Sequence, residues 1–167
     1  MKKNLLLVSA LMLLCATVAS AQNAVPAAAD KAAATKIVQL LEGSGHSYTK
    51  AKEGVWVIKY EGKQLSQFSV ITIYAEGMII FVATVAEKAE FKPAPDLLQK
   101  LLGLNDSLDR VKVGIDKDGD VIVRIDLSLR VVDQPELNAN LEQISAAVDE
   151  TYAVVKPFLL APKKAAK

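Results

Sequence analysis

The chain has 167 residues, of which 51% are hydrophobic, and its 20 basic and 19 acidic residues give a formal net charge of +1. This length suits one domain with a real core, and the balanced charge offers no electrostatic footprint for nucleic acid. The only cysteine, Cys15, lies near the start of the chain. The remainder can therefore hold neither a disulfide nor a thiolate metal site.

Residues 1–21 have the organisation of a secretory signal peptide. Two lysines precede an apolar run, and the stretch ends in Ala-Ser-Ala, an A-x-A cleavage site. The run is short for a membrane span, and the leucine before Cys15 argues against lipid attachment. We expect cleavage after Ala21, no stable membrane anchor afterwards, and a periplasmic or secreted protein.

Two short segments flank the expected domain. Residues 22–29 are small and apolar without any period, which predicts a flexible leader. Residues 161–167, APKKAAK, predict a solvated basic tail. Residues 30–160 are expected to form a single domain.

The first half of this domain changes from a helical period to a period of two. Asp30 can cap a helix that runs to about Glu42, where two glycines stop it. The next residues predict three strands joined by the turns EGK and EG: Val55–Tyr60, Ser66–Ala75 and Met78–Ala86. A shorter stretch, Tyr48–Ala51, is a further strand candidate.

The second half predicts helix, two strands and a long helix. Pro93 and Pro95 open a helix over PDLLQKLLGL, and RVKVGI and VIVRIDLSLR read as strands. Asp133 and Glu136 have capping-box spacing before an amphipathic stretch that ends near Pro157. The order α-β-β-β-α-β-β-α indicates an α+β fold, with an antiparallel sheet and helices packed on it.

Three aspartates alternate in VGIDKDGDVIVRID: Asp116, Asp118 and Asp120. A calcium loop that begins at Asp116 needs glycine at its sixth position and glutamate at its twelfth, where this chain has Val121 and Leu127. Asp118-Gly119 between two strand patterns is instead typical of a tight hairpin turn. We interpret the stretch as a hairpin, with a weak metal site as the alternative.

His46, the only histidine, lies in the loop GSGHSY after the first helix. Ser44 and Ser47 are near it in sequence, but neither sits in a nucleophile elbow. No glycine-rich phosphate loop occurs, and no spacing singles out a pair of catalytic carboxylates. We therefore expect no catalytic residue, no metal ligand and no cofactor, and interpret His46 as a surface residue.

Aromatic residues gather on the three central strands, and the second and third of these strands also carry apolar side chains at both phases of the alternation. We expect most of these aromatics in the core, with a ligand cleft as the alternative: Trp56, Tyr60, Phe68, Tyr74 and Phe81. An antiparallel sheet with one wet face should alternate apolar with polar, as VIVRIDLSLR does. The last helix, a second subunit or a client peptide should therefore cover the second face of the central hairpin. The candidate partner-binding residues are Phe68, Val70, Ile71, Ile73, Ile79 and Phe81.

Four stretches carry a resemblance to a known family: LLEGSGHSYTKAKEGVWVIKYEGK, IYAEGMIIFVATV, KLLGLNDSLDRVKVGIDKDGDVIVRIDL and LNANLEQISAAVDETYAVV. Over about residues 30–160 the chain resembles the YbjN-like family of bacterial sensory-transduction regulators, with a type III secretion chaperone-like fold. The resemblance implies a small, often dimeric binding domain and brings no catalytic residues. Secretion chaperones are cytosolic, however, so the export signal departs from their client-delivery role.

Three functions remain open at this point. The first is an exported, non-enzymatic protein-binding or regulatory module, acting as a homodimer or on a protein or peptide client. The second is a small periplasmic hydrolase that uses carboxylates or His46, and the third is a carrier of an apolar ligand. The inventory of motifs favours the first, because a catalytic site normally shows a base, a nucleophile or metal ligands at a usable spacing.

Overall fold

The computed structural model describes residues 27–160, with side chains from residue 31 onward. The expected signal peptide, the first residues of the leader and the basic tail lie outside these residues. The chain separates into a unit of residues 1–32 and a unit of residues 33–167. In the first unit the described residues form the opening turns of a helix, and the sheet and its packing belong to the second.

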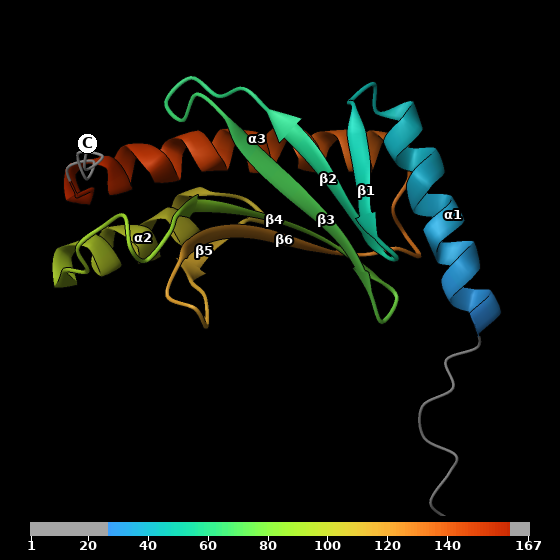
Figure 1. The fold of residues 1–167 in the computed structure, drawn as a ribbon, viewed down its shortest axis with the longest axis horizontal. Helices are drawn as coiled ribbons and strands as arrows, with labels where there is room; N and C mark the ends of the chain where they lie inside the picture. The colour runs from blue at the N-terminus through green and yellow to red at the C-terminus, as the bar shows by residue number, and fades with distance from the viewer. Residues whose placement is uncertain (1–26, 161–167) are drawn as a thin grey trace, which may run out of the picture. The chain divides into compact units, whose positions relative to one another are not determined.

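The elements follow the expected order, and the candidate strand near Tyr48 is present as β1 (Figure 1). The helices are α1 (Ala27–Gly43), α2 (Pro95–Ser107) and α3 (Gln134–Val155), and a single 3-10 turn, η1 (Lys156–Phe158), follows α3. The strands are β1 (Tyr48–Lys52), β2 (Val55–Tyr60), β3 (Phe68–Ala75), β4 (Met78–Ala86), β5 (Lys112–Ile115) and β6 (Val121–Ser128). The predicted α+β class with an antiparallel sheet is confirmed.

Helix α1 begins at Ala27, three residues before the expected start. Alanine has the highest intrinsic helix propensity, so the alanines at 27–29 extend the helix instead of forming a leader. Asp30 consequently lies inside the first turns and is not the N-cap that the sequence predicted.

All neighbouring strands are antiparallel, in the order β1-β2-β3-β4-β6-β5. The hairpin β3–β4 turns at Glu76 and Gly77, whose φ values of 50° and 78° are both positive, as the favoured two-residue hairpin turn requires. Strand β6 pairs with β4, although α2 and β5 lie between these two strands in the chain. This pairing brings Phe81 opposite Ile125. The predicted central hairpin therefore lies in the middle of the sheet.

One face of the sheet forms the core. Five side chains that point to this face are fully or almost fully buried: Trp56, Ile58, Val70, Phe81 and Ile125. Helix α3 packs on β4 and β6 at this face, and α2 packs on β5 and α3. The apolar stripe of α3 is buried along its length and includes Leu137, Leu141, Ile144, Val148 and Val155.

The start of α3 is capped as predicted. Asp133 is the N-cap, its carboxylate accepts a hydrogen bond from the Glu136 N–H at 2.9 Å, and Pro135 lies in the first turn. The reciprocal half of a capping box is not formed, because the Glu136 carboxylate pairs with Arg110 and accepts from the Asn140 amide. Helix α3 is thereby tied to the segment that precedes β5.

Asp149 on α3 holds the loop between β2 and β3. Its carboxylate accepts hydrogen bonds from the backbone N–H groups of Lys63, Gln64 and Leu65 at 2.7, 2.9 and 3.2 Å. A Cβ at Gly62 would lie 2.6 Å from Asp149 Oδ1, so only glycine fits beside this carboxylate. Burial opposes ionisation of Asp149, but the three N–H bonds outweigh it and hold its pKa below the usual range.

Candidate protein-binding face

The face of the sheet opposite the core carries a continuous apolar surface. Eight residues make up this outer face: Val55, Val57, Ile71, Ile73, Met78, Ile80, Val82 and Ile122. The strand register aligns seven of them in rungs across β2, β3 and β4, and Ile122, on β6, pairs with Thr84 of β4. One rung joins Val57, Ile71 and Val82, and the next joins Val55, Ile73 and Ile80.

No helix of the described residues covers the outer face. In Figure 1, α3 passes behind β2 and β3, on the side away from the viewer, and no helix lies in front of these strands. All eight residues are half-buried by their neighbours in the sheet, and none belongs to the apolar cluster that packs around α3. Full burial of a large apolar side chain stabilises a protein by about 1.5–3 kcal/mol. Because these side chains remain partly exposed to solvent, the folded chain lacks part of that stabilisation.

Both rungs continue from apolar residues on β4 to charged residues on β6 and β5. Val82 pairs with Arg124, which pairs with Lys112, and Ile80 pairs with Asp126. The Asp126 carboxylate accepts from Lys112 Nζ at 2.6 Å and from Arg124 Nε at 2.7 Å. Its burial opposes ionisation, but these two cationic donors hold the pKa of Asp126 below its usual range.

The six predicted partner-binding residues divide between the two faces. Ile71 and Ile73 lie on the outer face, as expected of an accessible surface. The other four lie in the core beneath the helices and are at most 8% exposed, which corrects the expectation that they are available to a partner: Phe68, Val70, Ile79 and Phe81. The correction follows from the period of two, because residues adjacent in a strand point to opposite faces.

Sequence reasoning did not name the other members of the outer face as binding residues. Met78, Ile80 and Val82 share the phase of β4 that is opposite to Phe81, so alternation alone separates them from the core set. Ile122 is the apolar residue on the otherwise polar phase of β6. The alternation therefore contained the missing signal, but only knowledge of which phase faces α3 identifies the outer one.

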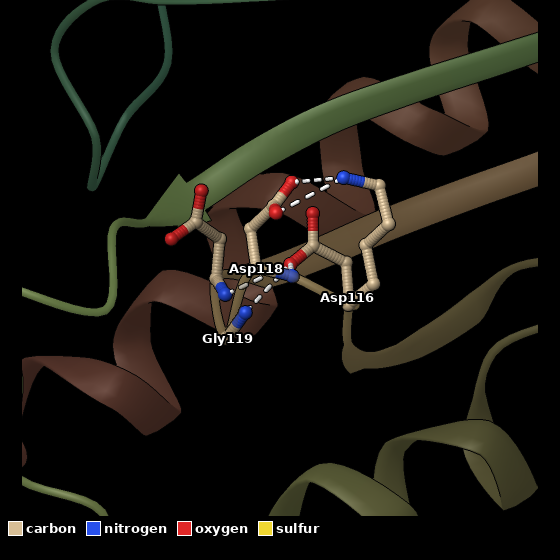
Figure 2. Close-up of polar contacts among 5 residues, drawn as sticks. Asp116, Asp118 and Gly119 are labelled. Carbon is tan, nitrogen blue, oxygen red and sulfur yellow. Dashed lines mark hydrogen bonds and ion pairs between the residues drawn. The ribbon is translucent and has the colours of Figure 1, made fainter.

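The aspartate-rich turn is a hairpin, as predicted, and Figure 2 shows how Asp116 organises it. Its Oδ1 accepts hydrogen bonds from the backbone N–H groups of Asp118, Gly119 and Asp120 at 2.9, 3.0 and 3.0 Å. These bonds, led by that from Asp120, hold the pKa of Asp116 below its usual range. Within residues 31–160, no three histidine, cysteine or carboxylate side chains form a group suited to a metal ion.

Ser44 and His46 do not form a nucleophile and base. The Ser44 hydroxyl donates to the Leu41 carbonyl at 2.6 Å and accepts from the His46 backbone N–H at 3.2 Å. The exposed His46 ring instead lies against Tyr60, with 5.0 Å between ring centroids, and Tyr60 stacks on Phe68 at 5.4 Å. Burial, together with the charge of Glu142, raises the pKa of Tyr60 to about 12, so its phenol is neutral.

The aromatic residues of the central strands belong to the core rather than to a closed cleft. Trp56, Phe68 and Phe81 are buried, and Tyr60 and Tyr74 pack against the same cluster. A hollow of about 390 Å³ opens beside Tyr60 and Phe68, but Lys59, Glu61 and other polar residues also line it. This mixed lining differs from the closed apolar cavity that a carrier of an apolar ligand needs.

Helix α2 exposes two leucines of its expected stripe. Leu97 and Leu101 are buried, whereas Leu98 and Leu102 are 44% and 70% exposed.

Among residues 27–160, no helix has the length and apolar character to cross a bilayer.

The strand order and the helices on one face define a type III secretion chaperone-like fold, which solved structures share. A chain of the heterodimeric ExoU–SpcU complex from the type III secretion system of Pseudomonas aeruginosa is 18% identical, with a TM-score of 0.57 over 71% of this chain and 97% of that one. A chain of the HopA1–SchA chaperone–effector complex is 13% identical, with a TM-score of 0.53 over 75% and 97% of the two chains. At such identities the likeness shows the fold alone.

The family follows from the sequence itself. Residues 34–157 match the YbjN family model, described as "Putative bacterial sensory transduction regulator", and the chain therefore belongs to the YbjN family. The crystal structure of YbjN from E. coli is 22% identical, with a TM-score of 0.54 over 74% of this chain and 92% of that one. No curated protein matches the sequence.

Proposed function

We propose that this protein is an exported, non-enzymatic binding module that holds another polypeptide on its outer face. The observation that carries the proposal is the uncovered apolar surface centred on Ile71, Ile73 and Ile80. A surface of this kind on a folded domain is typical of a site for a protein partner. The fold adds support, since chains of the same fold occur in the ExsC–ExsE complex and in a chaperone–effector complex.

Export is the part of the proposal that rests on residues 1–21 alone. Their basic start, apolar run and A-x-A end are those of a cleaved signal peptide. In the periplasm or outside the cell, the outer face would meet exported polypeptides rather than the clients of a cytosolic secretion chaperone.

The absence of catalysis is proposed from the geometry of the only histidine. A general base must reach the proton that it abstracts, but Ser44 already donates its hydroxyl proton to Leu41 and the His46 ring packs on Tyr60. The carboxylates Asp116 and Asp149 are likewise occupied by three backbone N–H groups each. These assignments leave the outer face as the feature best suited to function.

A paired experiment with wild-type protein and Ile71→Asp tests this function. Light scattering at micromolar concentration reports whether a second copy occupies the face, and mass spectrometry of co-purifying proteins reports a client. We expect one of these associations in the wild type and its loss in Ile71→Asp, because a carboxylate there would have to be desolvated on binding. A wild-type monomer that captures nothing and binds no hydrophobic dye would contradict the proposal.

A further inference from the structure

We propose that the outer face selects polypeptide segments that combine apolar side chains with carboxylates, which pair with Arg124 and Lys112. This inference rests on the proposed binding function and specifies the chemistry of the partner. It begins from the rung that runs from Val57 through Ile71 and Val82 to Arg124 and Lys112. Neighbouring strands lie about 4.8 Å apart, so a segment laid across β3 and β4 reaches the two cations.

The cations at the end of this rung are only partly neutralised. Within residues 27–160, Asp126 is the one acidic residue at an outward-facing strand position, and it is shared between Arg124 and Lys112. Its side chain is 17% exposed, whereas those of Arg124 and Lys112 are 43% and 68% exposed. An incoming partner therefore meets two accessible cations and a carboxylate that is already engaged.

Arg124 retains donors suited to a second carboxylate. Its bond to Asp126 uses Nε, and a guanidinium carries five N–H donors in a planar fork that can bind a carboxylate with two of them. Lys59 adds a further cation at an outward-facing position of β2, opposite Ser69. Glu53 and Glu76 lie in the β1–β2 and β3–β4 turns, outside the strands, and Glu53 pairs with Lys50.

The same charges disfavour a second copy as the occupant. Two outer faces packed on each other would bring the cations of both copies to a shared, partly desolvated surface with only one carboxylate from each. Like charges so placed repel each other. A partner with the opposite charge associates faster, and its charges fix its orientation on the surface. An acidic and apolar segment satisfies both the apolar rungs and their cationic end.

The nearby sheet edge is closed, which directs a partner to the face. Asn105 on α2 binds β5 as a neighbouring strand would: its Oδ1 accepts from the Val113 N–H at 2.7 Å and its Nδ2 donates to the Val113 carbonyl at 3.0 Å. A strand added at β5 would have to displace this side chain. The cations on β5 and β6 are therefore presented to a segment lying on the outer face, and not to one that extends the sheet.

Selection of a phage-displayed library of random 12-residue peptides on the purified protein tests the inference. Peptides should be retained by the wild type, lost on Ile71→Asp, and enriched in both apolar residues and Asp or Glu. The double variant R124Q/K112Q should keep the apolar enrichment and lose the acidic one. For a selected peptide, Glu→Gln substitution should weaken wild-type binding by about two- to fivefold at low salt and leave binding to the double variant unchanged.

The matched control is K92Q/K156Q, which removes two exposed lysines away from the outer face and should retain the acidic preference. Peptides that depend on Ile71 but are neutral or basic would overturn the inference and leave the binding function intact. Peptides whose capture does not depend on Ile71, or no captured peptides at all, would contradict the binding function itself. Both charge variants alter solvent-exposed side chains, so circular dichroism should show the wild-type fold.

Discussion

Val70 and Ile71 are adjacent in β3 and point to opposite faces, so one substitution made at each position tests which face is covered. Val70 is fully buried opposite Ile58 in the core, and Ile71 is half-buried between Val57 and Val82 on the outer face. Aspartate at either position places the same negative charge in the same strand. Any difference between the two variants therefore reports the environment of the side chain.

The structure predicts a large difference in the free energy of unfolding. Val70→Asp loses about 1.5–3 kcal/mol of apolar burial. A buried carboxyl group whose pKa rises by about 3–5 units loses a further ~4 kcal/mol at pH 7, because it has to take up a proton that the unfolded chain does not hold. The sum, about 5–7 kcal/mol, is comparable to the whole stability of a typical domain, about 5–15 kcal/mol. For Ile71→Asp, strand propensity and partial burial contribute only about 1–2 kcal/mol.

Urea unfolding followed by circular dichroism at pH 7 measures the free energy of unfolding of each variant and of the wild type. We expect Ile71→Asp to unfold cooperatively at a slightly lower urea concentration, and Val70→Asp to be unfolded or nearly so without urea. Equal and severe destabilisation by the two variants would refute this reasoning, because it would mean that part of the chain itself covers the outer face.

Three further predictions concern the loop clamp, the aspartate turn and the start of the chain. Asp149→Asn should lower the free energy of unfolding by about 1–2 kcal/mol at pH 7. Since the pKa of Asp149 is lowered in the folded state, its contribution is present above the unfolded value of about 4 and is lost as the pH falls through the folded value; acid titration of stability should therefore be shallower in the variant. Millimolar calcium should leave the melting temperature unchanged, whereas binding at a hundredfold excess over Kd would add about 2.7 kcal/mol, and a rise abolished by Asp118→Asn would contradict the assignment of a simple turn. The intact mass of the exported protein should correspond to a chain that begins at Gln22 without lipid, and a retained Met1 or an acylated Cys15 would be inconsistent with signal cleavage.

Local chemistry was sufficient to predict most elements of the fold. Glu76 and Gly77 mark the β3–β4 turn because a tight hairpin needs positive φ at both positions, and both have it. Asp133 marks the start of α3 because its carboxylate can accept from the N–H three residues on, as it does. The start of α1 was misplaced because Asp30 can serve either as a cap or inside a helix, and the preceding alanines decide for the second.

The binding face was only half predictable, for a reason that lies in β3 and β4. Both phases of these strands are apolar, so alternation divides their residues into two sets without showing which set is covered. The decision is a long-range one, made when the stripe of α3 packs on the set that contains Val70 and Phe81. The charged end of the rungs was equally hidden, because Lys112, Arg124 and Asp126 of the β5–β6 hairpin join the apolar rungs only through the pairing of β6 with β4.

Site-specific photo-crosslinking in the producing cell is the most direct test of the claim that the outer face binds a polypeptide. A benzophenone side chain would replace Ile80, at the centre of the outer face, and in a control would replace Glu150, on the exposed side of α3. We predict that illumination yields a discrete protein adduct from position 80, that position 150 yields none, and that Ile71→Asp abolishes the adduct. An Ile80 variant that folds and is exported but gives no adduct, or equal adducts from both positions, would contradict the claim.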